Sequence, residues 1–205
     1  KSHNFVGTGT GFPVAKFDPL SRTLHSVLNS NMELETPVSA LSRHFNCQPS
    51  ELEQKLTSHS FGITIEGSIY VRSVAAINDD GTIRFFSDMS FGEYLELVKA
   101  TDFKQSLQRD FDAFLRGKSG KPVALIANDC ILRRLNNPNN LSGIGTFDNV
   151  MVSGFSTFGE YLGLHQNQTV TAIGFFEHDD KQSYHDEYVT NFPFHLASFT
   201  NYHLQ

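Results

Sequence analysis

The order of apolar and polar residues divides the chain into strand-like and helix-like stretches. Between Phe61 and Val98 the pattern becomes one of period two, as expected of strands with one covered face, and Ile63, Ile65, Ile69, Val71 and Val74 indicate two strands. The turn Asp79-Asp80-Gly81 opens a hairpin that returns at Ile83 to Phe86, and Glu93 to Val98 gives a further strand. This region therefore predicts an antiparallel meander.

The first residues predict a strand pair ahead of the meander. Gly7 to Phe17 is Gly-rich and then apolar, as at the beginning of a strand. Asp18-Pro19 forms a turn, after which Arg22 to Val27 is the expected pairing partner.

Three helices are predicted from apolar spacing and from capping residues. The first covers Pro37 to Phe45, with Thr36 as its N-cap, and the second begins at Ser50 with a Ser50-Glu-Leu-Glu53 capping box. Thr101-Asp102 precedes the third, which is strongly amphipathic. Its apolar face consists of Phe103, Leu107, Phe111, Phe114 and Leu115.

After the third helix the pattern returns to strands and ends in a helical tail. Pro122 to Ala127 is apolar on both faces, which predicts a central buried strand, and a short helix is expected around Asp129 to Arg134. Two more strands are expected near Val150 to Phe155 and Thr169 to Phe176. The tail from Tyr184 is predicted to be helical, interrupted at Pro193. The fold class is therefore α+β, with a mixed, mostly antiparallel sheet and a few packed helices.

Composition removes several classes of function. The net charge of −6 disfavours nucleic acid, because phosphate affinity comes mainly from clustered Lys and Arg. No apolar run is long enough to span or contact a membrane. Cys47 and Cys130 fit no ligand spacing or disulfide framework, which indicates a reducing, cytoplasmic compartment. Because the chain begins at Lys1, we expect it to be a piece of a longer protein.

The run Gly154-Phe-Ser-Thr-Phe-Gly-Glu160 comes close to two catalytic motifs and matches neither. A nucleophile elbow needs glycine where Phe158 stands, so no reaction is assigned to Ser156. A phosphate-binding loop needs lysine where Glu160 stands, and a carboxylate would repel phosphate. We predict no catalytic residue and no enzyme activity, and expect the run to line a pocket.

Three further groups have residue types that could carry chemistry. His178-Asp179-Asp180 and His185-Asp186-Glu187 have metal-binding residue types but no compact ligand register, so a solvated loop is expected and no metal is predicted. Arg133 and Arg134 follow a buried strand, and they could either clamp an anion or supply surface charge. Cys130 is expected to be a small buried residue rather than a reactive thiol.

Three segments together resemble the C-terminal half of the FIST sensory domain (F-box and intracellular signal transduction). They are Asp129-Cys-Ile-Leu-Arg-Arg134, the run Gly154 to Glu160, and Asn167-Gln-Thr-Val-Thr-Ala-Ile173. Earlier strands between Phe61 and Phe86 also match, and the resemblance extends from about Gly7 to His178. It implies a domain over residues 1–180, followed by a helical segment, 181–205, that leads toward an output module.

The resemblance implies an input module of a bacterial signal-transduction protein that binds a small molecule such as an amino acid. It also implies partners within the parent protein: the N-terminal FIST half and an output domain of the chemotaxis or two-component type. Some relatives are haem proteins that sense nitric oxide. No cofactor is assigned here, because His165 is the one histidine between the matched blocks and no ligand role follows for it.

The leading hypothesis from the sequence is therefore a sensory domain that binds a small ligand through polar groups near strand ends. Arg133 and Arg134 would bind a carboxylate, Glu160 an amine, and Ser156, Thr157 and Asn167 would supply hydrogen bonds. Two alternatives stay open. One is a protein-interaction module that docks to the N-terminal half, and the other is a haem-based nitric oxide sensor.

Overall fold

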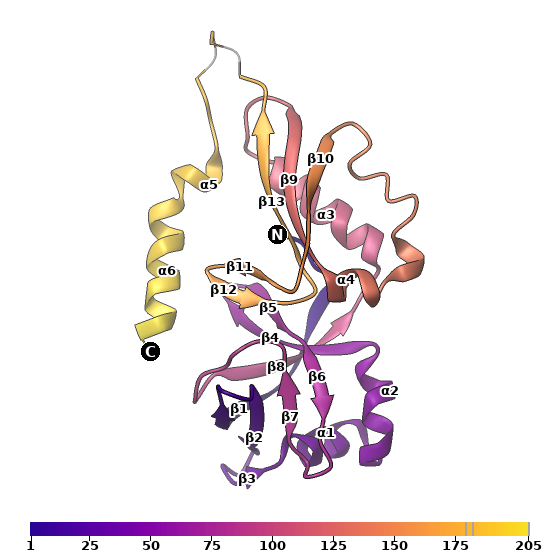
Figure 1. The fold of residues 1–205 in the computed structure, drawn as a ribbon. Coiled ribbons are helices and arrows are strands. Elements are labelled where there is room, and N and C mark those ends of the chain that lie inside the picture. Colours follow the sequence, from indigo (N-terminus) through magenta and orange to yellow (C-terminus); the bar gives the residue numbers. More distant parts are fainter. Residues whose placement is uncertain (179, 182, 205) are drawn as a thin grey trace. The chain divides into compact units, whose positions relative to one another are not determined.

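The structure of the chain is a computed structural model that describes residues 1–178, 180–181 and 183–204, with the backbone alone at 203 and 204. Contacts divide the chain into two compact units (Figure 1). Unit 1 comprises Lys1–Asn4, Asp102–Gly163 and Gln168–Gln205, and unit 2 comprises Phe5–Thr101 and Leu164–Asn167. Both contain strands and helices, which confirms the α+β class.

Unit 2 is built on an eight-stranded sheet in which every adjacent pair is antiparallel. The strands run in the order β5-β4-β8-β1-β2-β7-β6, with β3 paired to β2. The predicted pairing of the first two strands is confirmed, since Asp18 lies opposite Thr23. The strands are β1 (Phe5–Asp18), β2 (Thr23–Leu28), β3 (Leu34–Glu35), β4 (His59–Ile65), β5 (Ser68–Arg72), β6 (Val74–Ile77), β7 (Ile83–Phe85) and β8 (Tyr94–Ala100).

Proline stands at or just before the start of both helices of unit 2. In α1 (Pro37–Phe45), Thr36 is the N-cap as predicted, and its hydroxyl oxygen accepts from the Ser39 N–H at 3.2 Å. For α2 (Leu52–Leu56) the predicted capping box is wrong by two residues, because the box runs from Gln48 to Glu51 and not from Ser50 to Glu53. A 3-10 turn, Pro49–Glu51, precedes the helix, and the Glu51 carboxylate accepts from the Gln48 N–H at 2.8 Å. Pro49 causes the difference, because its fixed φ starts the helical backbone early.

The core of unit 2 follows from the period-two pattern. Side chains of alternate residues on β4 and β8 meet α1 and α2, and the rings of Phe61 and Phe85 pack edge to face at 5.5 Å between centroids. The fully buried residues of this core include Leu24, Leu52, Ile83, Leu95 and Leu97.

Unit 1 contains a three-stranded mixed sheet in the order β10-β9-β13. The central strand β9 (Pro122–Cys130) pairs in parallel with β10 (Met151–Thr157) and antiparallel with β13 (Val170–Phe176). Backbone bonds of Ser2 with Val170 place the first residues along β13. The remaining elements are α3 (Phe103–Leu115), α4 (Ile131–Leu135), the 3-10 turn Pro138–Asn140, β11 (Glu160–Leu162), α5 (Glu187–Thr190) and α6 (Phe192–Leu204), while β12 (Leu164–Gln166) belongs to unit 2.

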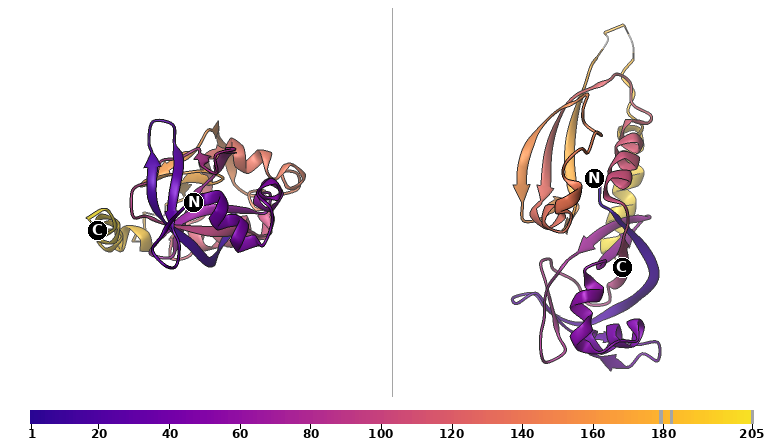
Figure 2. Two further views of the ribbon diagram at one scale, coloured as in Figure 1. Left: turned by 90° about the horizontal axis from the view of Figure 1, so that it is seen from below. Right: turned by 90° about the vertical axis from the view of Figure 1, so that its right-hand side faces the viewer.

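Helix α3 packs against one face of the sheet, and no helix or strand of the described residues covers the opposite face (Figure 2, right). On the covered face the rings of Phe114 and Phe176 lie 5.7 Å apart. On the other face Ile126 is 46% exposed. The prediction that β9 is buried on both faces is therefore wrong. The strand is central in the order of the sheet, but among the described residues a helix covers only one side.

The tail is helical, as predicted, and consists of two pieces. Asp186 caps α5 by accepting from the Tyr188 N–H at 2.9 Å, and it pairs with Lys118 at 3.4 Å. The break falls at Asn191, and Pro193 lies in the first turn of α6, where its missing N–H is not needed. Within the described part of the chain, no helix has the length and apolarity that crossing a membrane would require.

The cap of α3 gives a test of the fold. Asp102 accepts from the Gln105 N–H at 2.7 Å, so Asp102→Ala should lower the free energy of unfolding by about 1 kcal/mol. Urea denaturation measures this change. Asp112→Ala, at an exposed position of the same helix, is the control and should change stability by less than about 0.5 kcal/mol. Equal effects of the two substitutions would contradict the assigned cap.

Candidate functional site

The carboxyl ends of β9 and β10 form the candidate site. Because the two strands are parallel, these ends meet at one edge of the sheet, where Thr157 lies opposite Cys130. The chain leaves β9 directly into α4, and three residues after Thr157 it begins β11 with Glu160. Polar side chains from separate segments thus converge. We call them the Glu160 cluster: Asp129, Cys130, Arg133, Thr157, Glu160 and Thr169.

Glu160 is the central carboxyl of this cluster and is only 4% exposed. Its Oε1 accepts from the Thr157 hydroxyl at 2.5 Å, and Thr169 gives a second side-chain hydrogen bond. Its Oε2 is buried and has no hydrogen-bond partner among the described residues. Burial raises the pKa of Glu160 to about 7, while the two threonine hydrogen bonds and Arg133 act in the opposite direction.

Arg133 is the buried cation beside this carboxyl. Its Nη1 donates to Oδ1 of Asp129, four residues earlier on β9, at 2.9 Å. Its guanidinium lies 4.2 Å from the centre of the Phe103 ring. Burial lowers the pKa of Arg133, and the neighbouring Asp129 opposes that shift. The ion pair and the ring together fix the guanidinium plane, which suits a planar anion.

Cys130 contributes no reactive group to the cluster. The residue is fully buried, as the sequence predicted, and burial raises the pKa of its thiol. A thiol whose pKa is raised stays neutral near pH 7, and the thiolate is the form that attacks or binds metal.

The other predicted site residues lie elsewhere. Arg134 is exposed on α4, and Ser156 is exposed on the face of β10 opposite to Thr157. Asn167 is fully buried in unit 2, where its Oδ1 accepts from the Ser73 N–H at 3.2 Å. Of the six residues, the structure brings together Arg133, Thr157 and Glu160. A ligand role for any of the six stays a prediction.

Asp129 and Thr169 are members of the cluster that the sequence did not predict as site residues. Thr169 lies one residue before β13, whose pairing with β9 brings the Thr169 carbonyl within 3.0 Å of the Cys130 N–H. The run Asn167-Gln-Thr169 belongs to a segment that resembles the family, but the sequence does not give the strand register that places Thr169 beside Cys130.

Close packing against the neighbouring strand requires glycine at position 154. A Cβ at this position would lie 1.8 Å from the carbonyl oxygen of Ala127 on the neighbouring strand. Gly154 lies within β10 and not at a strand-to-helix turn, so the residue serves close strand packing and not a nucleophile elbow.

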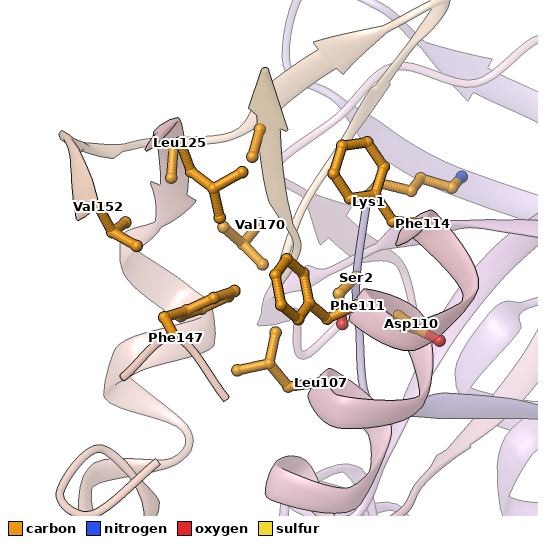
Figure 3. Close-up of a pocket in the computed structure, with 12 residues that line it drawn as sticks. Lys1, Ser2, Leu107, Asp110, Phe111, Phe114, Leu125, Phe147, Val152 and Val170 are labelled. Carbon is orange, nitrogen blue, oxygen red and sulfur yellow. The ribbon is translucent and has the colours of Figure 1, made fainter. Parts of the chain in front are cut away.

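A small apolar cavity lies in unit 1 between α3 and the sheet, and we call it the α3 cavity. Phe111 and Phe147 both line it, while the charged ends of Lys1 and Asp110 point away (Figure 3). Its volume is about 60 Å³. The residues that line it include no His, Cys, Met or Tyr, which are the usual axial ligands of haem iron, so no role for haem is derived from this cavity.

The acidic loop before α5 does not form a metal site in the described part of the chain. His178 lies 3.6 Å from Asp180, and Asp186 caps α5, whereas Asp179 falls outside the described residues. Within the residues that were placed, no group of three His, Cys, Asp or Glu side chains could hold a metal ion.

Burial of Glu160 predicts a specific pH dependence. Its pKa is about 7 in the folded state against 4.5 ordinarily, so between these values the folded state keeps a proton that the unfolded state has lost. The free energy of unfolding should therefore fall by roughly 3 kcal/mol as the pH rises from about 4.5 to 7. Urea denaturation at several pH values should show this decline, and Glu160→Gln should remove it.

The exposed Glu177→Gln variant is the control and should keep the decline. If the wild type and Glu160→Gln show the same pH slope, the proposed burial of the carboxyl is wrong.

Comparison with known families agrees with the resemblance in the sequence. The model of the FIST C domain matches residues 37–162, which is more than half of the chain and includes Arg133, Thr157 and Glu160. Neither the curated proteins nor the solved structures gave a significant match. The chain therefore belongs to the FIST C domain family, whose domains serve sensory roles in signal transduction.

Proposed function

We propose that the Glu160 cluster binds a small metabolite with an amino group, such as an amino acid or a derivative. The observation that carries the proposal is the Glu160 Oε2 atom, which is buried without a hydrogen-bond partner among the described residues. An unsatisfied buried carboxyl oxygen is costly, and a ligand ammonium group that donates to it would offset that cost.

Arg133 supports the other end of such a ligand. It is 4% exposed and held by Asp129 and Phe103, and a guanidinium of fixed orientation can bind a ligand carboxylate through parallel N–H donors. Thr157 holds Oε1 of Glu160, and Oε2 is the oxygen that would accept from the ligand. The cluster thus combines an acceptor for an amine with a donor for a carboxylate.

The proposed role follows from this chemistry and from the family. The chain would be a cytoplasmic ligand-binding input domain of a bacterial protein, with a chemotaxis or two-component output as its partner. We assign it no reaction: Cys130 is a neutral buried thiol, and Ser156 is exposed on the opposite face of β10 from Glu160's partner Thr157.

A thermal-shift screen of the amino acids, followed by calorimetry, tests the proposal. A ligand that binds the folded state should raise the melting temperature. Its affinity should fall about tenfold for each pH unit below about 7, because Glu160 must lose its proton to accept from an ammonium group. Thr157→Val should weaken binding roughly tenfold, because it removes the hydrogen bond that orients Oε1.

Ser153→Ala is the matched control, since Ser153 is exposed on the same strand away from the strand end, and it should bind as the wild type does. Absence of a shift for every amino acid would reject the proposal. Affinity that is independent of pH would reject the role of Glu160.

A protein-interaction role is the second candidate, and the uncovered sheet face favours it. Met151, Phe155 and Ile173 are 75%, 71% and 67% exposed on this face. No residue of the face is charged, so a partner would meet no unpaired charge there. The proposed partner is the N-terminal FIST half. The side chains of the face are Ala124, Ile126, Asn128, Met151, Ser153, Phe155, Thr171, Ile173 and Phe175.

Size-exclusion chromatography with light scattering tests this surface. If the face docks, the isolated chain should self-associate as its concentration rises, because the apolar face stays open. Ile173→Asp should abolish this association, whereas Leu20→Asp, at a 97% exposed position in unit 2, should leave it unchanged. A wild type that is monomeric at every concentration, and that does not bind the N-terminal half, would contradict the second candidate.

A further inference from the structure

The α3 cavity is walled by apolar side chains of α3 and of all three strands of the unit 1 sheet. Phe111 and Phe147 meet edge to face at 5.1 Å, and Figure 3 shows Leu107 and Val170 directed toward the same space. Leu125 and Val152 complete the apolar wall from β9 and β10. The cavity is separate from the Glu160 cluster, because none of the residues in its wall belongs to that cluster.

Small side chains beneath the helix explain why the space is not filled. Ala127 and Ala172 stand on the face of the sheet that α3 covers, where larger residues would reach the helix. The ring of Phe114 fills the space above Gly174 on the same face, and a Cβ at position 174 would lie 2.7 Å from this ring. As a result Val152, although it faces α3, stays 42% exposed.

The wall determines which molecules fit. The charged ends of Lys1 and Asp110 point away from the cavity (Figure 3), so its interior favours uncharged groups. The volume of about 60 Å³ is less than half of the ~150 Å³ of a cavity that holds benzene. A short branched aliphatic group or the edge of a ring matches this size.

We propose that the α3 cavity is a second binding site, which takes the apolar end of a small uncharged organic molecule and leaves its polar end in the open mouth. The group would fill space that the side chains leave empty and would gain dispersion contacts with Phe111, Phe147 and Val152. The site is independent of the proposed amine site at Glu160. Occupation by an aromatic side chain of a second copy is the competing outcome.

Methyl-group NMR with 3-methylbutan-1-ol as the probe tests the site directly. Saturable shifts should appear at methyl groups of Leu107, Leu125, Val152 and Val170, which line the cavity. Ile126 and Ile173, which the pleat of β9 and β13 directs to the opposite face, should not shift. Saturable shifts at Ile126 and Ile173 alone, or shifts that never saturate, would overturn the proposal. If the methyl signals of the cavity wall change with protein concentration in the absence of the probe, a second copy occupies the cavity, and this result would also overturn the proposal.

A matched pair of substitutions on β9 provides the control. Ala127→Leu fills the cavity and should raise the Kd of the probe at least about tenfold, whereas Ala124→Leu makes the same change on the opposite face and should leave it unchanged. Circular dichroism verifies that both variants fold. Should Ala127→Leu not fold, Val152→Phe at the partly exposed wall serves instead and should weaken binding similarly.

Glu160→Gln separates this inference from the amine site, because it should leave binding of the alcohol probe unchanged. Equal affinity of the wild type and the cavity-filling variant would overturn the proposed site even if an amino acid binds at Glu160.

Discussion

The parallel pairing of β9 with β10 is the constraint on which the candidate site depends. It sets Thr157 beside Cys130 and brings the ends of both strands to one edge, from which α4 and β11 continue. The pairing is close enough that Gly154 has no room for a Cβ beside the Ala127 carbonyl. A side chain at Gly154 would therefore disturb the register that brings Arg133, Thr157 and Glu160 together.

Within that geometry, the balance between burial and hydrogen bonding sets the state of Glu160. Two threonine hydroxyls and Arg133 favour the charged carboxylate, but the loss of hydration outweighs them and raises the pKa to about 7. The charge of Asp129, which raises the pKa of Glu160, opposes the effect of Arg133. The cluster is thus a carboxyl that is close to its point of ionisation, where one additional positive group changes its charge.

The sequence predicted best what depends on neighbouring residues. The caps at Thr36 and Asp102, the β1–β2 pair and the strand β10 follow from local chemistry and local alternation, and the structure confirms them. Arg133, Thr157 and Glu160 could be anticipated as neighbours because each stands at the end of a predicted strand or just after it. Asn167 could not be placed, since its bond to Ser73 joins segments 94 residues apart in the chain.

The error about β9 has the same physical origin. An apolar run on both faces predicts burial, yet the sequence cannot say whether the second face is covered within the chain or by another molecule. In unit 1 the two faces of the sheet differ. Helix α3 covers one face but leaves space over Ala127 and Ala172, whereas the other face is exposed around Ile126. Strand β9, which is apolar on both faces, therefore contributes side chains to two surfaces of different kinds. One has a cavity sized for part of a small molecule, and the other is a flat uncharged face suited to a folded partner.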